Sequence, residues 1–282
     1  MTASGTLREH HDRAQEVVWT LKDALPDSKA FNALGLADRG PIIQAVAELR
    51  GSETDSAELW YAATAWWVCQ FAETELVALS LVTDLLAKSE SNSGLKHNLA
   101  DQVGDEARHY NIFLELSSEL PTQSSAAWLR QFQTVVTESP DWRLRHLALS
   151  LILESQALGN LRQLRADVSF PRAAYAARLI LADEARHVNI GRIVATSWVE
   201  EVSSAEIRVA RDWIRELIQI CSDRYSEGPI LQRGDRLNLS GTSFAREIAW
   251  SGNTRVLNGL RTTGLIDETI SSNWEQQLKI GG

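Results

Sequence analysis

Two nearly identical octapeptides, Asp183-Glu184-Ala185-Arg186-His187-Val188-Asn189-Ile190 and the Asp-Glu-Ala-Arg-His-Tyr-Asn-Ile of residues 105–112, are the strongest architectural signal in this chain. On a helix, residues three apart lie on neighbouring positions of one face. Glu184 and His187, like Glu106 and His109, can therefore present a carboxylate and an imidazole together. Two such pairs predict one metal site built from two halves.

The partner segments of the repeat match as well. The two motifs are 78 residues apart, and Glu75-Leu-Val-Ala-Leu matches Glu154-Ser-Gln-Ala-Leu at an offset of 79. Glu75 lies 31 residues before Glu106, and Glu154 lies 30 before Glu184. Such a spacing fits one long helix, a turn and a return to the same level. Each half thus supplies a Glu from one helix and Glu-x-x-His from the next. Glu73 is the alternative on the first helix, but it breaks the repeat.

The grouping of four carboxylates has a direct chemical consequence. Inside a helical bundle they would repel one another and would be costly to desolvate. Two divalent cations remove both costs, and two neutral imidazoles complete the ligand set. Oxygen-rich ligands with one His per metal and no thiolate suit iron or manganese better than zinc or copper.

The chain reads as all-α, with almost no strand pattern. Residues 56–88 lack Pro and Gly and carry apolar residues at helical spacing. Further helices are expected over 95–120, through Trp128 and Phe132, from a Ser139 N-cap to about 167, and over 171–199, 205–224 and 242–260. We expect one domain over 1–282, with a four-helix bundle at about 56–199 and flanking helices in 1–55 and 200–282.

Composition narrows the class of protein. The chain has 282 residues, 44% hydrophobic and 23% charged, as in an ordinary globular protein. A net charge of −9 argues against nucleic acid or an anionic membrane as partner. No apolar run reaches bilayer length, no signal-peptide pattern opens the chain, and Cys69 and Cys221 form no CxxC. A soluble, cytoplasmic protein is expected.

The order E…DExxH…E…DExxH resembles the ferritin-like di-iron carboxylate proteins over about residues 56–199. The DExRH form looks most like the hydroxylase subunits of bacterial multicomponent monooxygenases, with ribonucleotide reductase small subunits and di-iron N-oxygenases as relatives. The resemblance implies a ferritin-like four-helix bundle with additional terminal helices. It also implies six metal ligands: Glu75, Glu106, His109, Glu154, Glu184 and His187.

The resemblance also assigns the residues around the ligands. Asp105 and Asp183 would each accept a hydrogen bond from the ligand His of the other half, which fixes its tautomer. Arg108 and Arg186 would balance these aspartates. The alternative is that both arginines are simply exposed helix residues.

Three positions depart from particular relatives. Leu158 stands where the monooxygenase hydroxylases place a Thr, and Phe113 stands where reductase small subunits place the radical Tyr. Tyr110 directly follows His109 and would point elsewhere. Ile180 stands where aminobenzoate-type N-oxygenases carry a further His ligand. Ferritins proper are shorter and lack the second ExxH.

The function expected from the resemblance is O2-dependent oxidation. Two Fe ions, with Mn as an alternative, and O2 would hydroxylate, desaturate or N-oxygenate a small organic substrate. Electrons would come from a separate reductase or ferredoxin, because the chain shows no flavin or nicotinamide motif, and a homodimer is expected. The alternatives are a ferroxidase or other metal-handling protein, and a di-manganese or mixed-metal radical protein.

Other notable side chains have structural interpretations. Trp66, Trp67 and Trp198 occur at helical spacing and are expected in the core rather than in an electron relay. His97 and His146 fall outside the ligand register and are expected to be ordinary polar positions. The tandem His10 and His11 are expected to be exposed.

Overall fold

The computed structural model describes residues 56–88, 93–118, 120, 123, 126–166, 170–230 and 236–278. The expected helices of residues 1–55, with His10 and His11, lie outside this part. The described residues are helical and contain no β-strand, only an isolated bridge between Ile230 and Arg236. The all-α prediction is confirmed for them.

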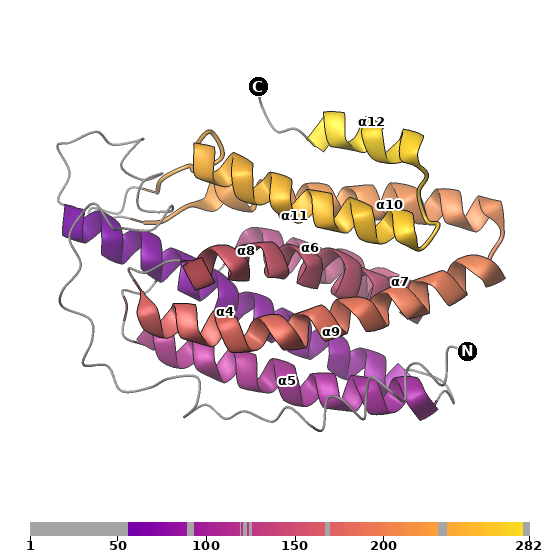
Figure 1. Ribbon diagram of the computed structural model, residues 1–282, viewed down its shortest axis with the longest axis horizontal. Helices are drawn as coiled ribbons and strands as arrows, with labels where there is room; N and C mark the ends of the chain where they lie inside the picture. Colours follow the sequence, from indigo (N-terminus) through magenta and orange to yellow (C-terminus); the bar gives the residue numbers. More distant parts are fainter. Residues whose placement is uncertain are drawn as a thin grey trace.

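Two long helices, α4 (Ser56–Lys88) and α5 (Ser93–Ser118), pack along each other; in the view of Figure 1, α5 lies below α9 and α4 passes behind it. α4 has the predicted bounds. Its own apolar residues occur on most of its sides, and it is therefore buried against several neighbouring helices. Trp66 and Trp67 lie in its core-facing surface, as expected. The ring of Phe71 stacks on Phe113 of α5 with centroids 4.8 Å apart. This contact fixes the two helices next to the two Glu-bearing turns.

The segment that carries Glu154 differs from the single α-helix that its pattern predicts. It begins as α7 (Trp142–Leu147), widens into the π-helix η3 (Ala148–Leu153) and continues as α8 (Glu154–Ala166). The N-cap is Asp141, whose carboxylate accepts the backbone N–H of Arg143 at 2.9 Å, and not Ser139. A π turn is rare and frequently occurs at functional sites.

α9 (Pro171–Glu201) packs along α8 and completes the region around the site. Pro171 starts it at the first helical position, where the missing N–H costs nothing. Gly191 of α9 is required for close approach to η3, because a Cβ there would lie 2.4 Å from Cβ of Ser150. Trp198 is buried in the core, as expected.

The remaining helices cover the outside of this group (Figure 1). α6 (Ala127–Glu138) contacts α4 and α10 (Ser204–Ser222), and the short η4 (Asp223–Glu227) follows α10. α11 (Ser243–Thr262) packs on α8, and α12 (Glu268–Leu278), which the sequence pattern did not predict, packs on α11. None of the described helices has the length and apolar character that crossing a bilayer requires.

Candidate metal centre

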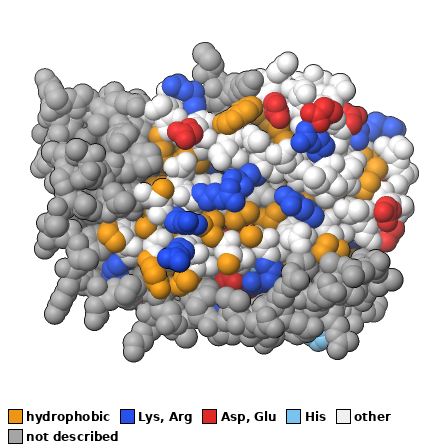
Figure 2. All heavy atoms as spheres, viewed as in Figure 1, with side chains coloured by type: hydrophobic (Ala, Val, Ile, Leu, Met, Phe, Trp, Pro, Cys, Tyr) orange, Lys and Arg blue, Asp and Glu red, His pale blue; other side chains and the backbone are white. Residues whose placement is uncertain are grey.

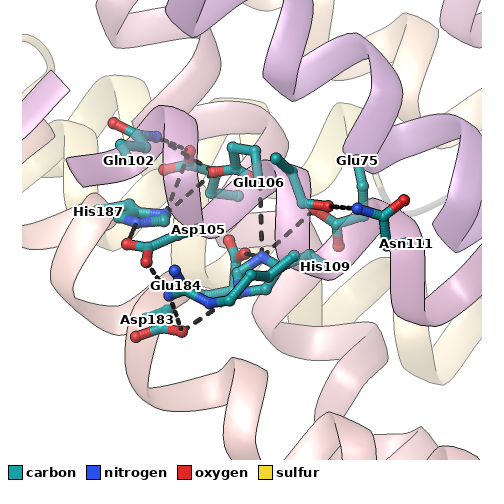
Figure 3. A network of polar contacts seen from close by, with 12 residues as sticks. Glu75, Gln102, Asp105, Glu106, His109, Asn111, Asp183, Glu184 and His187 are labelled. Atoms are coloured by element: carbon teal, nitrogen blue, oxygen red, sulfur yellow. Dashed lines mark hydrogen bonds and ion pairs between the residues drawn. The ribbon is translucent and has the colours of Figure 1, made fainter. Parts of the chain in front are cut away.

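The six predicted ligands converge in the interior from four helical segments. Figure 3 shows Glu75, Glu106, His109, Glu184 and His187 at this point. α4 and α8 each supply one Glu, and α5 and α9 each supply one Glu-x-x-His pair. All six residues are buried, and none of them is more than 2% exposed. They form two groups that could each hold a metal ion: Glu75, Glu106, His109 and Glu184, and Glu106, Glu154 and His187.

The first group surrounds Nδ1 of His109. This nitrogen lies 3.6 Å from a carboxylate oxygen of Glu75 and 3.6 Å from Oε2 of Glu106. It lies 3.2 Å from Oε1 of Glu184. Three carboxylates and one imidazole therefore face a common point between α4, α5 and α9.

The second group surrounds Nδ1 of His187. Oε1 of Glu106 is 3.2 Å away and Oε1 of Glu154 is 3.8 Å away. Glu106 thus turns one oxygen to each histidine and joins the two groups. Glu184 belongs to the first group alone, so the arrangement departs from the two-fold symmetry of the sequence repeat.

Both histidines are oriented by an aspartate of the opposite half. Nε2 of His109 lies 3.3 Å from Oδ2 of Asp183, and Nε2 of His187 lies 3.0 Å from Oδ2 of Asp105. An N–H donated to a carboxylate leaves the other ring nitrogen as an acceptor or metal ligand. In both rings that other nitrogen is the one that faces the glutamates.

Two arginines hold the aspartates in their charged form. Arg186 donates to Oδ1 of Asp183 at 2.9 Å and to Oδ2 of Asp105 at 2.5 Å, and Arg108 donates to Asp105. Burial alone would raise the pKa of Asp105, but His187, Arg186 and Arg108 lower it to about 2. Both arginines therefore act on the site, although Arg108 remains partly exposed.

The ligand atoms themselves lack ordinary partners. Buried atoms of the ligand side chains that form no hydrogen bond within the described part of the chain include Oε1 of Glu75, Oε2 of Glu106, Oε2 of Glu154, Oε1 of Glu184 and Nδ1 of His187. A buried polar atom without a partner is costly, and a cation ligated by these atoms removes that cost. The carboxylate and imidazole donor set suits iron or manganese. These residues are positioned to hold metal.

The pKa shifts of the four glutamates also indicate that the site requires bound cations. Burial raises the pKa of Glu75 and of Glu154 well above the usual value, and it raises that of Glu184, where the charge of Glu106 adds to the effect. Glu106 differs: burial raises its pKa, but the nearby His109 and His187 lower it by more, so its pKa lies well below the usual value. Positive charge is thus required for all four carboxylates to ionise together.

The sequence did not indicate a role for Gln102, and it left Glu73 open as an alternative ligand. Gln102 lies one turn before Glu106 on α5 and donates to Glu154 at 2.5 Å and to Glu106 at 3.4 Å. Its spacing of four residues from a ligand was the available signal. Glu73, the alternative to Glu75, lies outside both groups, and its carboxylate accepts the backbone N–H of Ala126 at 2.6 Å.

His146 is not the ordinary polar position that was expected. It is fully buried on α7, and within the described residues neither ring nitrogen forms a hydrogen bond. Burial, helped by the charge of His187, lowers the pKa of His146 to about 4. Two α turns take about seven residues and the π turn adds about one, so His146 and Glu154 lie on the same side of their helix.

A small cavity of about 30 Å³ lies between α4, α8 and η4. Its wall includes Phe71 and Thr74, which flank Glu75 along α4, and Leu153 and Ala157, which flank Glu154 along α8. The cavity is therefore next to the two helical turns that carry the single glutamates of the site.

Comparison with known proteins adds no assignment. No protein-family model matches the chain, and a search of curated proteins finds no significant match.

Proposed function

We propose that this protein is a ferritin-like di-iron oxidase or oxygenase that uses O2 to oxidise a small organic molecule. The observation that carries the proposal is the pair of buried ligand groups joined by Glu106, with unpartnered ligand atoms aimed at each. Bound iron would supply the one-electron and O2 chemistry that no side chain of the chain provides. Manganese in one or both positions is the alternative that metal analysis decides.

The residues around the site have separable tasks in this proposal. Asp183 and Asp105 orient the histidines, and Gln102 holds the carboxylate of Glu154 by a hydrogen bond. The stacked rings of Phe71 and Phe113 form an apolar wall near the first group and keep bulk water away. Exclusion of water protects reactive species from side reactions.

The adjacent cavity favours an organic substrate over iron handling alone. An enzyme that only oxidises iron needs a polar path for the ion, whereas the lining of this cavity is mainly aromatic and aliphatic. A ferroxidase is therefore the second candidate. An oxygenase and a ferroxidase differ in whether O2 consumption depends on an added organic substrate or on Fe²⁺ alone.

The test begins with metal-free protein loaded anaerobically with Fe²⁺ and then exposed to O2 in an oxygen electrode. An oxygenase consumes more O2 when an amine, fatty acid or aromatic substrate is added with a reductant, and yields an oxidised product. A ferroxidase consumes O2 in proportion to Fe²⁺ alone, well beyond two equivalents. Less than one equivalent of Fe or Mn per purified chain, unchanged by Glu184→Ala, would contradict the metal site itself.

An external electron donor belongs to the proposal, and the charge distribution supports an acidic one. In residues 154–199 the described carboxylates, Glu154, Asp183 and Glu184, are all buried. Figure 2 shows Lys and Arg side chains gathered over α8, α9 and α11. The exposed arginines of α8 and α9 are Arg162, Arg165, Arg178 and Arg192. A basic face on a chain of net charge −9 would steer an acidic protein to this side.

A further inference from the structure

Arg224 of η4 is a buried cation at the wall of the cavity beside the metal centre. Only 6% of it is exposed, and its guanidinium lies 4.8 Å from the ring centroid of Tyr225 and 6.0 Å from that of Trp128. Among the described residues no carboxylate forms an ion pair with it. Nη2 of Arg224 donates a hydrogen bond to Oε1 of Gln156 at 3.1 Å. Its Nε–H has no acceptor within the described part of the chain.

This environment is unusual for an arginine. A guanidinium has five N–H donors, and one amide oxygen with two aromatic rings does not satisfy them. Burying a charge without an opposite charge is costly, and charged side chains are rarely buried unless paired. The planar fork of an arginine matches a carboxylate in two-pronged geometry.

The surroundings of Arg224 are fixed by a chain of contacts. Gln156, its amide partner, donates to Oδ1 of Asn253 at 2.6 Å. Gly252 is necessary here, because a Cβ at that position would lie 2.0 Å from Oε1 of Gln156. Asn160 accepts from the hydroxyl of Tyr225 at 3.3 Å. Three elements, α8, α11 and η4, therefore hold the guanidinium in place.

The rest of the cavity wall is mainly apolar. Trp66, Trp67, Phe71 and Trp128 supply aromatic surface, and Leu153 and Ala157 supply aliphatic surface next to Glu154. A cavity of about 30 Å³ has room for a group the size of about two water molecules, which suits a carboxylate better than the larger phosphate.

We propose that the substrate is an organic carboxylic acid with an apolar body, and that Arg224 binds its carboxylate inside this cavity. The proposal rests on the oxygenase function proposed above. The carboxylate takes up the volume of the cavity, so side chains of α4 and α8 have to move apart to admit the body of the acid. Arg224 is a binding residue and takes no part in electron or proton transfer.

Direct binding tests the proposal without turnover. Full-length protein, metal-free and iron-loaded, is titrated with benzoate and butyrate and with the neutral benzamide and butyramide. Tryptophan fluorescence reports on the cavity, since Trp66, Trp67 and Trp128 line it, and calorimetry checks the affinity. We expect at least one acid to bind roughly tenfold or more tightly than its amide, as a charge-assisted hydrogen bond to a buried cation requires.

Substitutions locate the preference. Arg224→Gln should abolish the preference for the acid, whereas Arg215→Gln, at an exposed position on α10, should retain it. Arg224→Lys keeps the charge and should keep a weaker preference, which covers the case in which the Gln variant fails to fold. Circular dichroism and metal content report on folding of each variant.

The outcomes separate the two proposals. Equal binding of acid and amide, no binding of either, or undiminished acid binding by Arg224→Gln would overturn the carboxylate site and leave Arg224 a structural residue. Iron binding and O2 consumption would be unaffected by that result. If the protein takes up neither Fe nor Mn when these are supplied but still shows Arg224-dependent acid binding, the oxygenase function is refuted and the carboxylate site stands.

Discussion

Asp183 lies 3.3 Å from Nε2 of His109, a residue 74 positions earlier in the chain, and Asp105 makes the corresponding contact with His187, 82 positions later. Each half of the repeat therefore orients the histidine of the other half. Arg186 donates to both aspartates and ties the two contacts together. The candidate metal centre is a product of the whole helix arrangement and of neither half alone.

Replacing one of these aspartates should weaken metal binding. Asp183→Asn keeps the shape but removes the charge that orients His109, and the loss of such a partner typically lowers metal affinity 10–100-fold. Competitive titration of Fe²⁺ or Mn²⁺ against a chelating dye measures the change. The matched control is Asp84→Asn, which breaks the ion pairs to Lys88 and Arg145 elsewhere on the molecule. Equal affinities in the two variants would contradict the role of Asp183.

Metal should stabilise the folded chain. The buried carboxylates of Glu75, Glu154 and Glu184 are costly without cations, and a ligand that binds only the folded state adds about 2.7 kcal/mol at a hundred times its Kd. For a chain of this length such a gain raises the Tm by several degrees. Thermal unfolding with a chelator and with Fe²⁺ measures the difference. The shift should vanish in Glu184→Ala, and its persistence there would place the metal elsewhere.

Acid should destabilise the protein through His146. Burial holds the pKa of His146 at about 4, whereas an unfolded chain has a value near 6.5. Between these pH values the unfolded state binds the additional proton. The stabilising effect is thus complete above about pH 6.5 and is lost as the pH falls towards 4, by up to about 3 kcal/mol.

Urea unfolding from pH 4.5 to 7.5 measures this dependence. His146→Leu should flatten the stability profile relative to the parent protein, because the buried titrating group is gone. Parallel profiles for the parent and His146→Leu would show that His146 does not contribute.

Close packing of η3 against α9 should make Gly191 intolerant of substitution. A Cβ at Gly191 would lie 2.4 Å from Cβ of Ser150, so Gly191→Ala should cost about 1–3 kcal/mol of the free energy of unfolding. Gly104 is exposed on α5, and the nearest atom to its added Cβ is 3.8 Å away. Gly104→Ala should stabilise by about 0.5–1 kcal/mol, since Ala favours a helix. Chemical denaturation distinguishes these opposite signs.

Charge reversal should identify the donor surface. Arg178→Glu with Arg192→Glu on α9 should slow reduction by an acidic donor protein, and the slowing should shrink at high salt. Stopped-flow reduction rates as a function of ionic strength supply the measurement. Arg208→Glu with Arg215→Glu, at exposed positions on α10, changes the net charge by the same amount without touching the basic face. A rate reduced equally by both changes would indicate net charge alone.

The sequence predicted the positions of the site residues well because the repeat constrains them twice. Helical spacing placed Glu106 and His109 on one face, and the repeat favoured Glu75 over Glu73. Contacts between residues on different helices were harder to predict, because they depend on how each helix is rotated about its own axis. The π turn could not be predicted, because the apolar run Ala148–Leu153 looks the same whether its turn is α or π.

Other differences have local causes. Ser139 and Asp141 are both good N-caps, and the sequence alone does not rank two candidates two residues apart. α12 is short and follows a turn at Gly264, whose φ of 79° suits glycine, so its weak apolar pattern gave little signal. Arg224 carried no motif at all. Its significance depends on burial and on the lack of an opposite charge nearby, which only the folded chain displays.

The crossed aspartates also bear on how this chain could have arisen and how it can change. A single ancestral helix pair with one Glu and one DExxH would hold an aspartate suited to a histidine that it does not contain. Two copies joined face to face, each lending its aspartate to the other, would complete the centre, and fusion of the copies would preserve the exchange. After fusion, substitution of Asp105 is constrained by its contact with His187, and substitution of Asp183 is constrained by its contact with His109. The two halves must therefore evolve together.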